Sequence, residues 1–273
     1  MLIFDSILSR TCYQATKCFR APPVQFRFPD LTIRVNTPSC EALLTEVRRR
    51  FRLGEGFALA TINLDHIVKL KTSTEYRKAY ASHDLIVADG NPVVWLSQIS
   101  GKSVELVPGS DMVHPMLKLA AEERMPVAFF GSMPAVLDLA ATRLAAEIPG
   151  LSIVWTGSPA MGFDPTGAEA LHALKAMQAA GARLCIVSLS APRQEIFGAF
   201  GRSIAPEIGF CGFGAGLDFV AGRQTRAPRW VRVLAMEWLW RALSAPTRMI
   251  PRYLACAAIL PSQTFEALRQ RRG

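Results

Sequence analysis

Short apolar runs along the chain are followed by polar or glycine residues that could take part in catalysis. Thr61 and Asn63 follow one run, and Asp89 and Gly90 follow the next. Apolar surroundings raise the pKa of a carboxyl group, which makes Asp89 a candidate general base that removes a proton from a hydroxyl group. A turn or helix-capping aspartate is the alternative interpretation of Asp89.

Two later segments carry residues that could hold a phosphate group. Pro192 to Glu195 open a predicted helix after an apolar run, and the free N–H groups of such a helix end bind anions. Gln194 and Glu195 are therefore candidate binding residues. Gly109 and Asp111 start another predicted helix and are candidates too, although a first-turn aspartate such as Asp111 also stabilises a helix without touching a ligand.

The glycine-rich segment from Gly212 to Asp218 follows another apolar run. Because glycines let the backbone approach a ligand closely, Gly212, Gly214 and Asp218 are candidate binding residues, as is Gly131 after an earlier run. The segment is not a dinucleotide fingerprint, since it follows the last predicted strand and leads into an arginine-rich stretch instead of toward an acidic residue. This disfavours a nucleotide-binding oxidoreductase, which stays as an alternative.

The residue pattern predicts neither a metal site nor a cofactor. There is no Asp-x-Asp pair, no HExxH motif and no Walker loop, and the four histidines lack the spacing of metal ligands. The six cysteines form no CxxC pair, which fits reduced thiols in a cytosolic protein. If a phosphate group leaves during the reaction, arginines and helix N-termini must offset its charge.

The chain becomes rich in arginine and aromatic residues after Gly222. The arginines are Arg223, Arg226, Arg229, Arg232, Arg241, Arg248 and Arg252, with tryptophans between them. Such a cationic amphipathic segment suits an anionic membrane surface or a diphosphate lipid head. The alternative is a solvated helical face whose tryptophans pack on the sheet. The net charge of +9 would also suit nucleic acid, but no recognition motif supports that partner.

The elements that must position these residues alternate between two periodicities. Apolar runs typical of buried strands lie at Phe57 to Ile62, Leu85 to Ala88, Val127 to Gly131, Leu151 to Trp155, Leu184 to Leu189 and Ile208 to Phe213. Helical periodicity covers Ser110 to Arg124, Pro134 to Ile148, Pro165 to Ala180 and Pro192 to Ser203. This alternation predicts an α/β fold, a mostly parallel Rossmann-like sheet with helices on both faces. Ligands of such sheets bind beyond the carboxyl ends of the strands.

We divide the chain into three parts. Residues 1–56 form an arm and a first helix, with one or two edge strands in Gln25 to Val35 and a helix that Ser39 caps and Gly54 ends. Residues 57–222 form the α/β core, and residues 223–273 form a basic helical appendage. With 273 residues, half of them hydrophobic by type, the chain is globular and not disordered. No apolar stretch is long enough to span a membrane, and because Met1 to Phe28 lacks a continuous apolar region we do not expect export by a signal peptide.

Several motifs occur in one order along the chain. They are Thr61-Ile62-Asn63, Ala88-Asp89-Gly90, Pro108-Gly109-Ser110-Asp111, Phe130-Gly131, Pro192-Arg193-Gln194-Glu195, Gly212 to Phe219, Arg226-Ala227-Pro228 and Glu237 to Arg241. In this order they resemble the WecG/TagA/CpsF glycosyltransferases, over about Thr61 to Tyr253. The resemblance implies an inverting transferase, cytoplasmic and peripherally bound to the inner face of the plasma membrane. Such enzymes move a sugar, often of the N-acetylmannosamine, N-acetylmannosaminuronate or glucuronate type, from UDP to a polyprenyl-diphosphate-linked acceptor during surface or exopolysaccharide synthesis.

The resemblance also implies roles for individual residues. It makes Asp89 the base, places Thr61, Asn63 and Gln194 in the pocket, and gives the tail arginines Arg241, Arg248 and Arg252 to the diphosphate; Arg226 lies in a matching motif. Many members carry an arginine where this chain has Leu106, so Arg124 or a tail arginine replaces it, or diphosphate binding is weaker. The stoichiometry of a homo-oligomer is left open, and a non-catalytic basic binding module is the second alternative.

Overall fold

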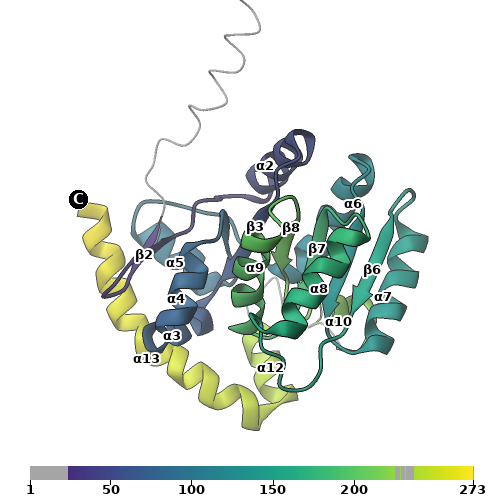
Figure 1. Ribbon diagram of the computed structural model, residues 1–273. Coiled ribbons are helices and arrows are strands. Elements are labelled where there is room, and N and C mark those ends of the chain that lie inside the picture. Colours follow the sequence, from purple (N-terminus) through teal and green to yellow (C-terminus); the bar gives the residue numbers. More distant parts are fainter. Residues whose placement is uncertain (1–23, 225–227, 229–230, 232–236, 273) are drawn as a thin grey trace, which may run out of the picture.

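The structure is a computed structural model that describes residues 24–224, 228, 231 and 237–272 (Figure 1). Its centre is a six-stranded sheet in the order β4-β3-β8-β7-β5-β6, and every neighbouring pair is parallel. The strands are β3 (Phe57–Ile62), β4 (Leu85–Ala88), β5 (Val127–Gly131), β6 (Ile153–Gly157), β7 (Leu184–Ser188) and β8 (Gly209–Gly212). The prediction of an α/β fold with a parallel sheet is confirmed.

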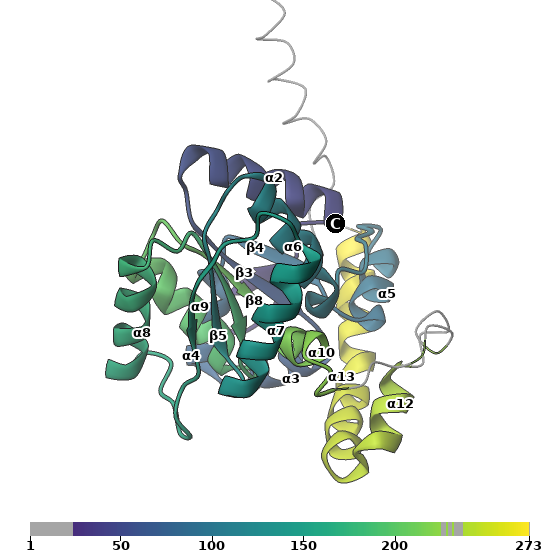
Figure 2. The same cartoon turned by 90° about the vertical axis from the view of Figure 1, so that its right-hand side faces the viewer.

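Helices cover both faces of the sheet (Figure 2). One face carries α2 (Cys40–Leu53), α6 (Gly109–Glu122), α7 (Pro134–Glu147) and α10 (Gly216–Val220); the other carries α3 (Leu64–Thr72), α4 (Thr74–Ala81), α8 (Ala168–Ala179) and α9 (Arg193–Ile204). Successive strand residues feed opposite layers, since Phe57 and Leu59 pack with the first group while Ala60 and Ile62 pack with the second. This two-sided burial explains why the strands are apolar throughout.

The helix before the sheet has the ends that its sequence predicts. Ser39 accepts a hydrogen bond from the Ala42 N–H at the start of α2, and Gly54 ends the helix in the left-handed region. Leu43 and Val47 of α2 are fully buried against the core. The expected edge strands exist as β1 (Gln25–Arg27) and β2 (Thr32–Arg34), but they form a separate antiparallel pair and not an edge of the main sheet.

The C-terminal segment is helical and packs on the core. It comprises α12 (Glu237–Ser244) and α13 (Pro246–Arg272), and α13 runs along α3 and α5 (Asn91–Ile99) beside the β4 edge (Figure 1). Cys256 and Ala267 of α13 are buried in the same apolar cluster as β1 and β2. The segment therefore begins near the carboxyl edge of the sheet and runs from there along the β4 side of the molecule (Figure 1).

Candidate active site

The exits of β3 and β4 bring Asp89 against Thr61 and Asn63. The register pairs Ile62 with Ala88, and the Asp89 N–H donates to the Ile62 carbonyl at 2.8 Å. Asp89 Oδ2 lies 3.5 Å from Thr61 Oγ1 and 3.4 Å from Asn63 Nδ2, both longer than the roughly 2.7–3.2 Å of a strong hydrogen bond. The half-buried carboxylate is thus oriented on this side by neutral donors that hold it loosely.

Three buried polar side chains, His66, Tyr80 and Glu195, lie next to the end of β3, and two of them contact its backbone. The Tyr80 hydroxyl donates to the Thr61 carbonyl at 2.7 Å, and His66 Nδ1 lies 2.7 Å from the same oxygen. His66 Nε2 lies 3.9 Å from Glu195 Oε1. Burial, and then the charge of Glu195, raise the pKa of Tyr80 well above its ordinary value, so its hydroxyl stays protonated. Tyr80 lies near the end of α4, where no sequence motif marks it.

Gln194 connects Glu195 to the glycine-rich loop after β8. Gln194 Oε1 accepts the Gly214 N–H at 2.9 Å, and Gln194 Nε2 donates to Glu195 Oε1 at 2.8 Å. Gly214 has a φ of +53°, and a side chain at Gly212 would crowd Gln194. Gln194 and Glu195 are both buried, and Glu195 is only 1% exposed. Glu195 therefore supports Gln194 and His66 from inside the molecule, and its predicted role in binding stays a prediction.

The loop after β5 contacts α10, the short helix that follows β8, through Asp218. Asp218 Oδ1 accepts hydrogen bonds from Ser132 Oγ at 3.2 Å and from Arg223 Nη1 at 3.1 Å. Gly131, just before Ser132, has a φ of +105°, and a side chain there would collide with the Ser188 backbone. The structure therefore brings the predicted residues Gly131 and Asp218 together at the same edge.

The start of α6 completes this group of loops. Gly109 is buried, and a Cβ there would lie 3.1 Å from Thr61 Cγ2 and 3.2 Å from Phe213 Cδ1, so α6 begins directly beside the β3 and β8 exits. Gly90 has a φ of +117° and faces Asn63. Asp111 is exposed in the first turn of α6, where it suits the helix N-terminus.

Among the predicted tail arginines, Arg252 reaches this edge. Its Nε lies 2.9 Å from Asp65 Oδ1, in the first turn of α3. Arg226 lies outside the described residues. Arg241 and Arg248 belong to α12 and α13, but their side chains fall outside the description.

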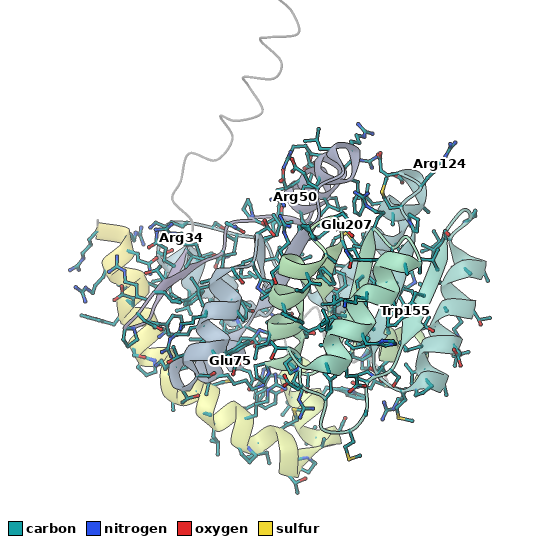
Figure 3. All side chains as sticks on the ribbon, viewed as in Figure 1. Arg34, Arg50, Glu75, Arg124, Trp155 and Glu207 are labelled. Atoms are coloured by element: carbon teal, nitrogen blue, oxygen red, sulfur yellow. The ribbon has the colours of Figure 1, made fainter. Side chains whose placement is uncertain are left out.

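Arg124 does not replace the arginine that many family members have at the position of Leu106. It follows the C-terminal end of α6, about 20 Å along the helix axis from Gly109. Figure 3 shows Arg124 near the upper end of the molecule, away from the carboxyl ends of the strands. Arg124 is therefore too far from the site for that role, which leaves a tail arginine as the replacement, or weaker diphosphate binding.

A family model identifies the reaction class. The model of the glycosyl transferase WecG/TagA/CpsF family matches residues 28–273, nearly the whole chain. The chain belongs to the WecG/TagA/CpsF glycosyltransferase family. This decides against an oxidoreductase and against a non-catalytic binding module. The match also begins well before Thr61, so α2 lies within the family region, which the motifs alone did not indicate.

The transferase thus belongs to the enzymes of cell-envelope polysaccharide synthesis, which use a nucleotide-sugar donor and a lipid-linked acceptor. Within the described ranges of this transferase, no helix is long and apolar enough to cross a membrane. Over the same residues, no His, Cys, Asp and Glu side chains gather in a group of three or more that could hold a metal ion.

Proposed function

We propose that the protein is an inverting transferase that moves a sugar from a UDP-sugar to a polyprenyl-diphosphate-linked acceptor. The donor sugar is of the N-acetylmannosamine, N-acetylmannosaminuronate or glucuronate type, and the product serves surface polysaccharide synthesis. The observation that carries the proposal is the half-buried Asp89 carboxylate at the sheet edge, within 3.5 Å of Thr61 and Asn63.

In the proposed reaction, Asp89 removes the proton from the acceptor hydroxyl. The acceptor oxygen forms a bond to the anomeric carbon while the bond from that carbon to the UDP oxygen breaks, so UDP leaves with the electron pair. One such displacement inverts the anomeric configuration. Thr61 and Asn63 donate to Asp89 from its side, and the buried His66 and Tyr80 keep the β3 exit in place.

The loops of the sheet edge are proposed to bind the nucleotide. Gly90, Gly109, Gly131, Gly212 and Gly214 allow close approach of backbone N–H groups, while Gln194 fixes the loop that contains Gly214. Arg252, together with Arg226, Arg241 and Arg248, is proposed to offset the diphosphate charge without a metal ion.

We also propose that α13 rests on the cytoplasmic face of an anionic membrane. Ile250, Leu254, Phe265 and Leu268 are 45–66% exposed, and at 3.6 residues per turn they fall within about 60° of one another. Met249 and Cys256 lie on the opposite, core-facing side. An exposed apolar stripe on a helix with arginines at its flanks is typical of interfacial helices.

Vesicle flotation tests the membrane assignment. Leu254→Asp should weaken binding to vesicles that contain anionic phospholipid, because it places a charge inside the stripe. Leu53→Asp is the matched control, since Leu53 is 62% exposed at the end of α2, on another part of the molecule. Equal binding of the two variants would contradict this assignment.

The transfer itself is tested by incubating the protein with a panel of UDP-sugars and a polyprenyl-diphosphate glycolipid in vesicles. We expect UDP release that requires both substrates, and a UDP-induced rise in melting temperature. UDP release that is independent of the acceptor, or no release with any donor, would contradict the proposal.

A further inference from the structure

The first turn of α3 holds a carboxylate that joins three separate segments near the sheet edge. Asp65 Oδ1 lies 2.9 Å from Arg252 Nε of α13, and Asp65 Oδ2 lies 2.8 Å from Lys69 Nζ of α3. Lys69 Nζ also donates to the Ala191 carbonyl at 3.3 Å, in the loop that leads to Gln194. Asp65 is 8% exposed, so its carboxylate is largely shielded from water, while the side chains of Lys69 and Arg252 are partly exposed.

The charge state of Asp65 suits this role. Burial acts to raise the pKa of Asp65, but the hydrogen bond from Lys69 and the positive charges of Arg252 and Lys69 outweigh it and lower the pKa below its ordinary value. The carboxylate is therefore an anion between two cations at neutral pH. Without it, Lys69 and Arg252 would face each other in a half-buried site as like charges.

Asp65 pairs with Arg252 through the inner guanidinium nitrogen of the arginine. The contact uses Nε, and within the described part of the chain no ion pair to the terminal guanidinium nitrogens of Arg252 is found. A guanidinium that pairs with one carboxylate through Nε can use its two terminal nitrogens to bind a second anion. An arginine whose side chain is already positioned loses less side-chain entropy when that anion binds. Asp65 is two residues from Asn63, whose amide contacts Asp89.

We propose that Asp65 is a positioning residue that anchors α13 to the catalytic edge and aims Arg252 at the diphosphate of the lipid-linked acceptor. This inference rests on the proposed function for the identity of the anion. The anchoring itself is independent of it. Asp65 is not proposed to contact a substrate; it acts through Arg252.

The first experiment is a double-mutant cycle on the full-length protein. Asp65→Asn keeps the shape of the side chain and removes its charge, so kcat/KM for the lipid-linked acceptor should fall about tenfold, mainly through a higher KM, while the UDP-induced melting shift is unchanged. Arg252→Gln should show the same loss, and the double variant should lose no more than either single variant. Losses that multiply in the double variant, or a wild-type KM in Asp65→Asn, would overturn the inference.

The second experiment needs no substrate. Hydrogen exchange of the amides in residues 246–256 should speed up about tenfold in Asp65→Asn, because the tether of α13 to α3 is lost. Glu75→Gln is the matched control, since Glu75 is an exposed acidic residue in the first turn of the neighbouring helix α4. Equal exchange in Asp65→Asn and Glu75→Gln would overturn the inference. If the wild-type protein transfers no sugar, the proposed function fails and this measurement still decides the anchoring.

Discussion

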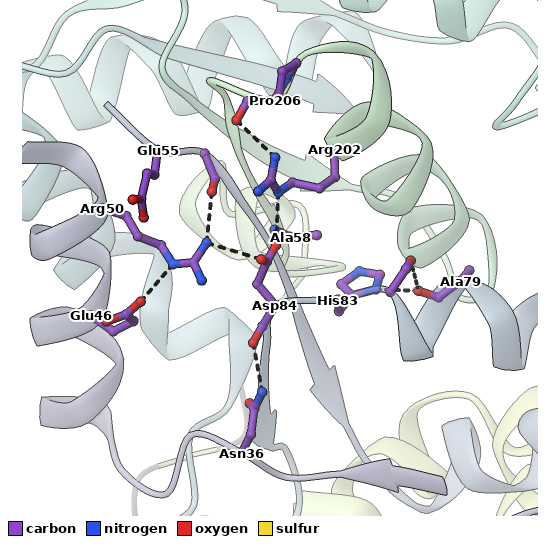
Figure 4. Close-up of polar contacts among 12 residues, drawn as sticks. Asn36, Glu46, Arg50, Glu55, Ala58, Ala79, His83, Asp84, Arg202 and Pro206 are labelled. Carbon is purple, nitrogen blue, oxygen red and sulfur yellow. Dashed lines mark hydrogen bonds and ion pairs between the residues drawn. The ribbon is translucent and has the colours of Figure 1, made fainter. Parts of the chain in front are cut away.

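Strand β4 has an aspartate directly outside each of its ends, and the two carboxylates differ in every described contact. Asp84, before the strand, accepts the Ala58 N–H at 2.9 Å and lies 3.1 Å from Arg202 Nε and 3.2 Å from Arg50 Nη1 (Figure 4). Asp89, after the strand, has Thr61 and Asn63 beside it at 3.4–3.5 Å.

The comparison shows how a carboxylate that holds elements together differs, in its contacts and its place in the sheet, from one proposed to act as a base. Two arginines and a backbone N–H at short distances fix the position of Asp84, so it can hold α2, α9 and the sheet together. Thr61 and Asn63 are neutral donors that lie at longer distances from Asp89 and help to orient its carboxylate. A general base must also reach the substrate hydroxyl, and Asp89 lies at the carboxyl edge of the parallel sheet, where ligands of such sheets bind, whereas Asp84 lies at the opposite edge.

The largest expected effect is on turnover, at Asp89 after the strand. Asp89→Asn should lower kcat about 100-fold or more, because the base is lost, while UDP binding and the melting temperature stay close to wild type. Steady-state UDP release and UDP titration measure the two properties. Asp138→Asn on the exposed face of α7 is the control. Unchanged turnover in Asp89→Asn would remove Asp89 from the proposed role.

Substitution of Asp84, at the opposite end of the strand, should change the stability of the fold and not turnover. Asp84→Asn removes the charge shared by Arg50 and Arg202, which are mostly shielded from solvent, and should lower the free energy of unfolding by about 1–3 kcal/mol. The folded fraction should keep wild-type kcat. Urea unfolding and UDP release check both, and a large loss of kcat without loss of stability would reverse the comparison.

A smaller change is expected from the groups beside the base. Thr61→Val removes the hydroxyl that faces Asp89 and keeps the shape of the side chain, so kcat should fall about fivefold, the size of one neutral hydrogen bond. Thr72→Val, at the exposed end of α3, is the matched control. A loss as large as that of Asp89→Asn would mean that Thr61 does more than orient the carboxylate.

The smallest effect concerns acid stability. Because the pKa of Asp65 is lowered in the folded protein, its ion pairs stabilise the fold above the unfolded pKa, about 4, and this contribution disappears as the pH falls through the lower folded pKa. The difference in unfolding free energy between wild type and Asp65→Asn should therefore be constant from about pH 6 to about pH 8 and shrink below about pH 4. Urea unfolding at pH 7 and pH 3 measures it; a difference that grows in acid would contradict the assignment.

The sheet could be predicted from the sequence because its strands are buried on both faces. Phe57–Ile62 and Leu85–Ala88 were expected with the same boundaries that the structure shows. The strand predicted at Leu151 to Trp155 is instead Ile153–Gly157, because it is an edge strand whose side chains alternate between partly buried and exposed. The short helices α3 to α5 were not predicted, since capping by Asn63 and packing against α13 define α3 more than its own apolar periodicity does.

Part of the site could be predicted for a simple reason of topology. In a parallel sheet the exits of neighbouring strands share one edge, so Thr61, Asn63 and Asp89 had to meet once β3 and β4 were neighbours. Asp65 and Tyr80 could not be found this way. Their partners, Arg252 and the Thr61 carbonyl, are fixed by packing between helices and strands far apart in sequence.

The most direct test of Asp89 as the base uses an acceptor whose reacting hydroxyl is replaced by a thiol. A thiol has a pKa of about 8.5, so sugar transfer to a thiol acceptor needs little help from a base. A sugar hydroxyl, in contrast, stays protonated at neutral pH and needs a base. We predict that Asp89→Asn transfers sugar to the thiol acceptor at close to the wild-type rate while it fails with the hydroxyl acceptor. An equal loss with both acceptors would contradict the account.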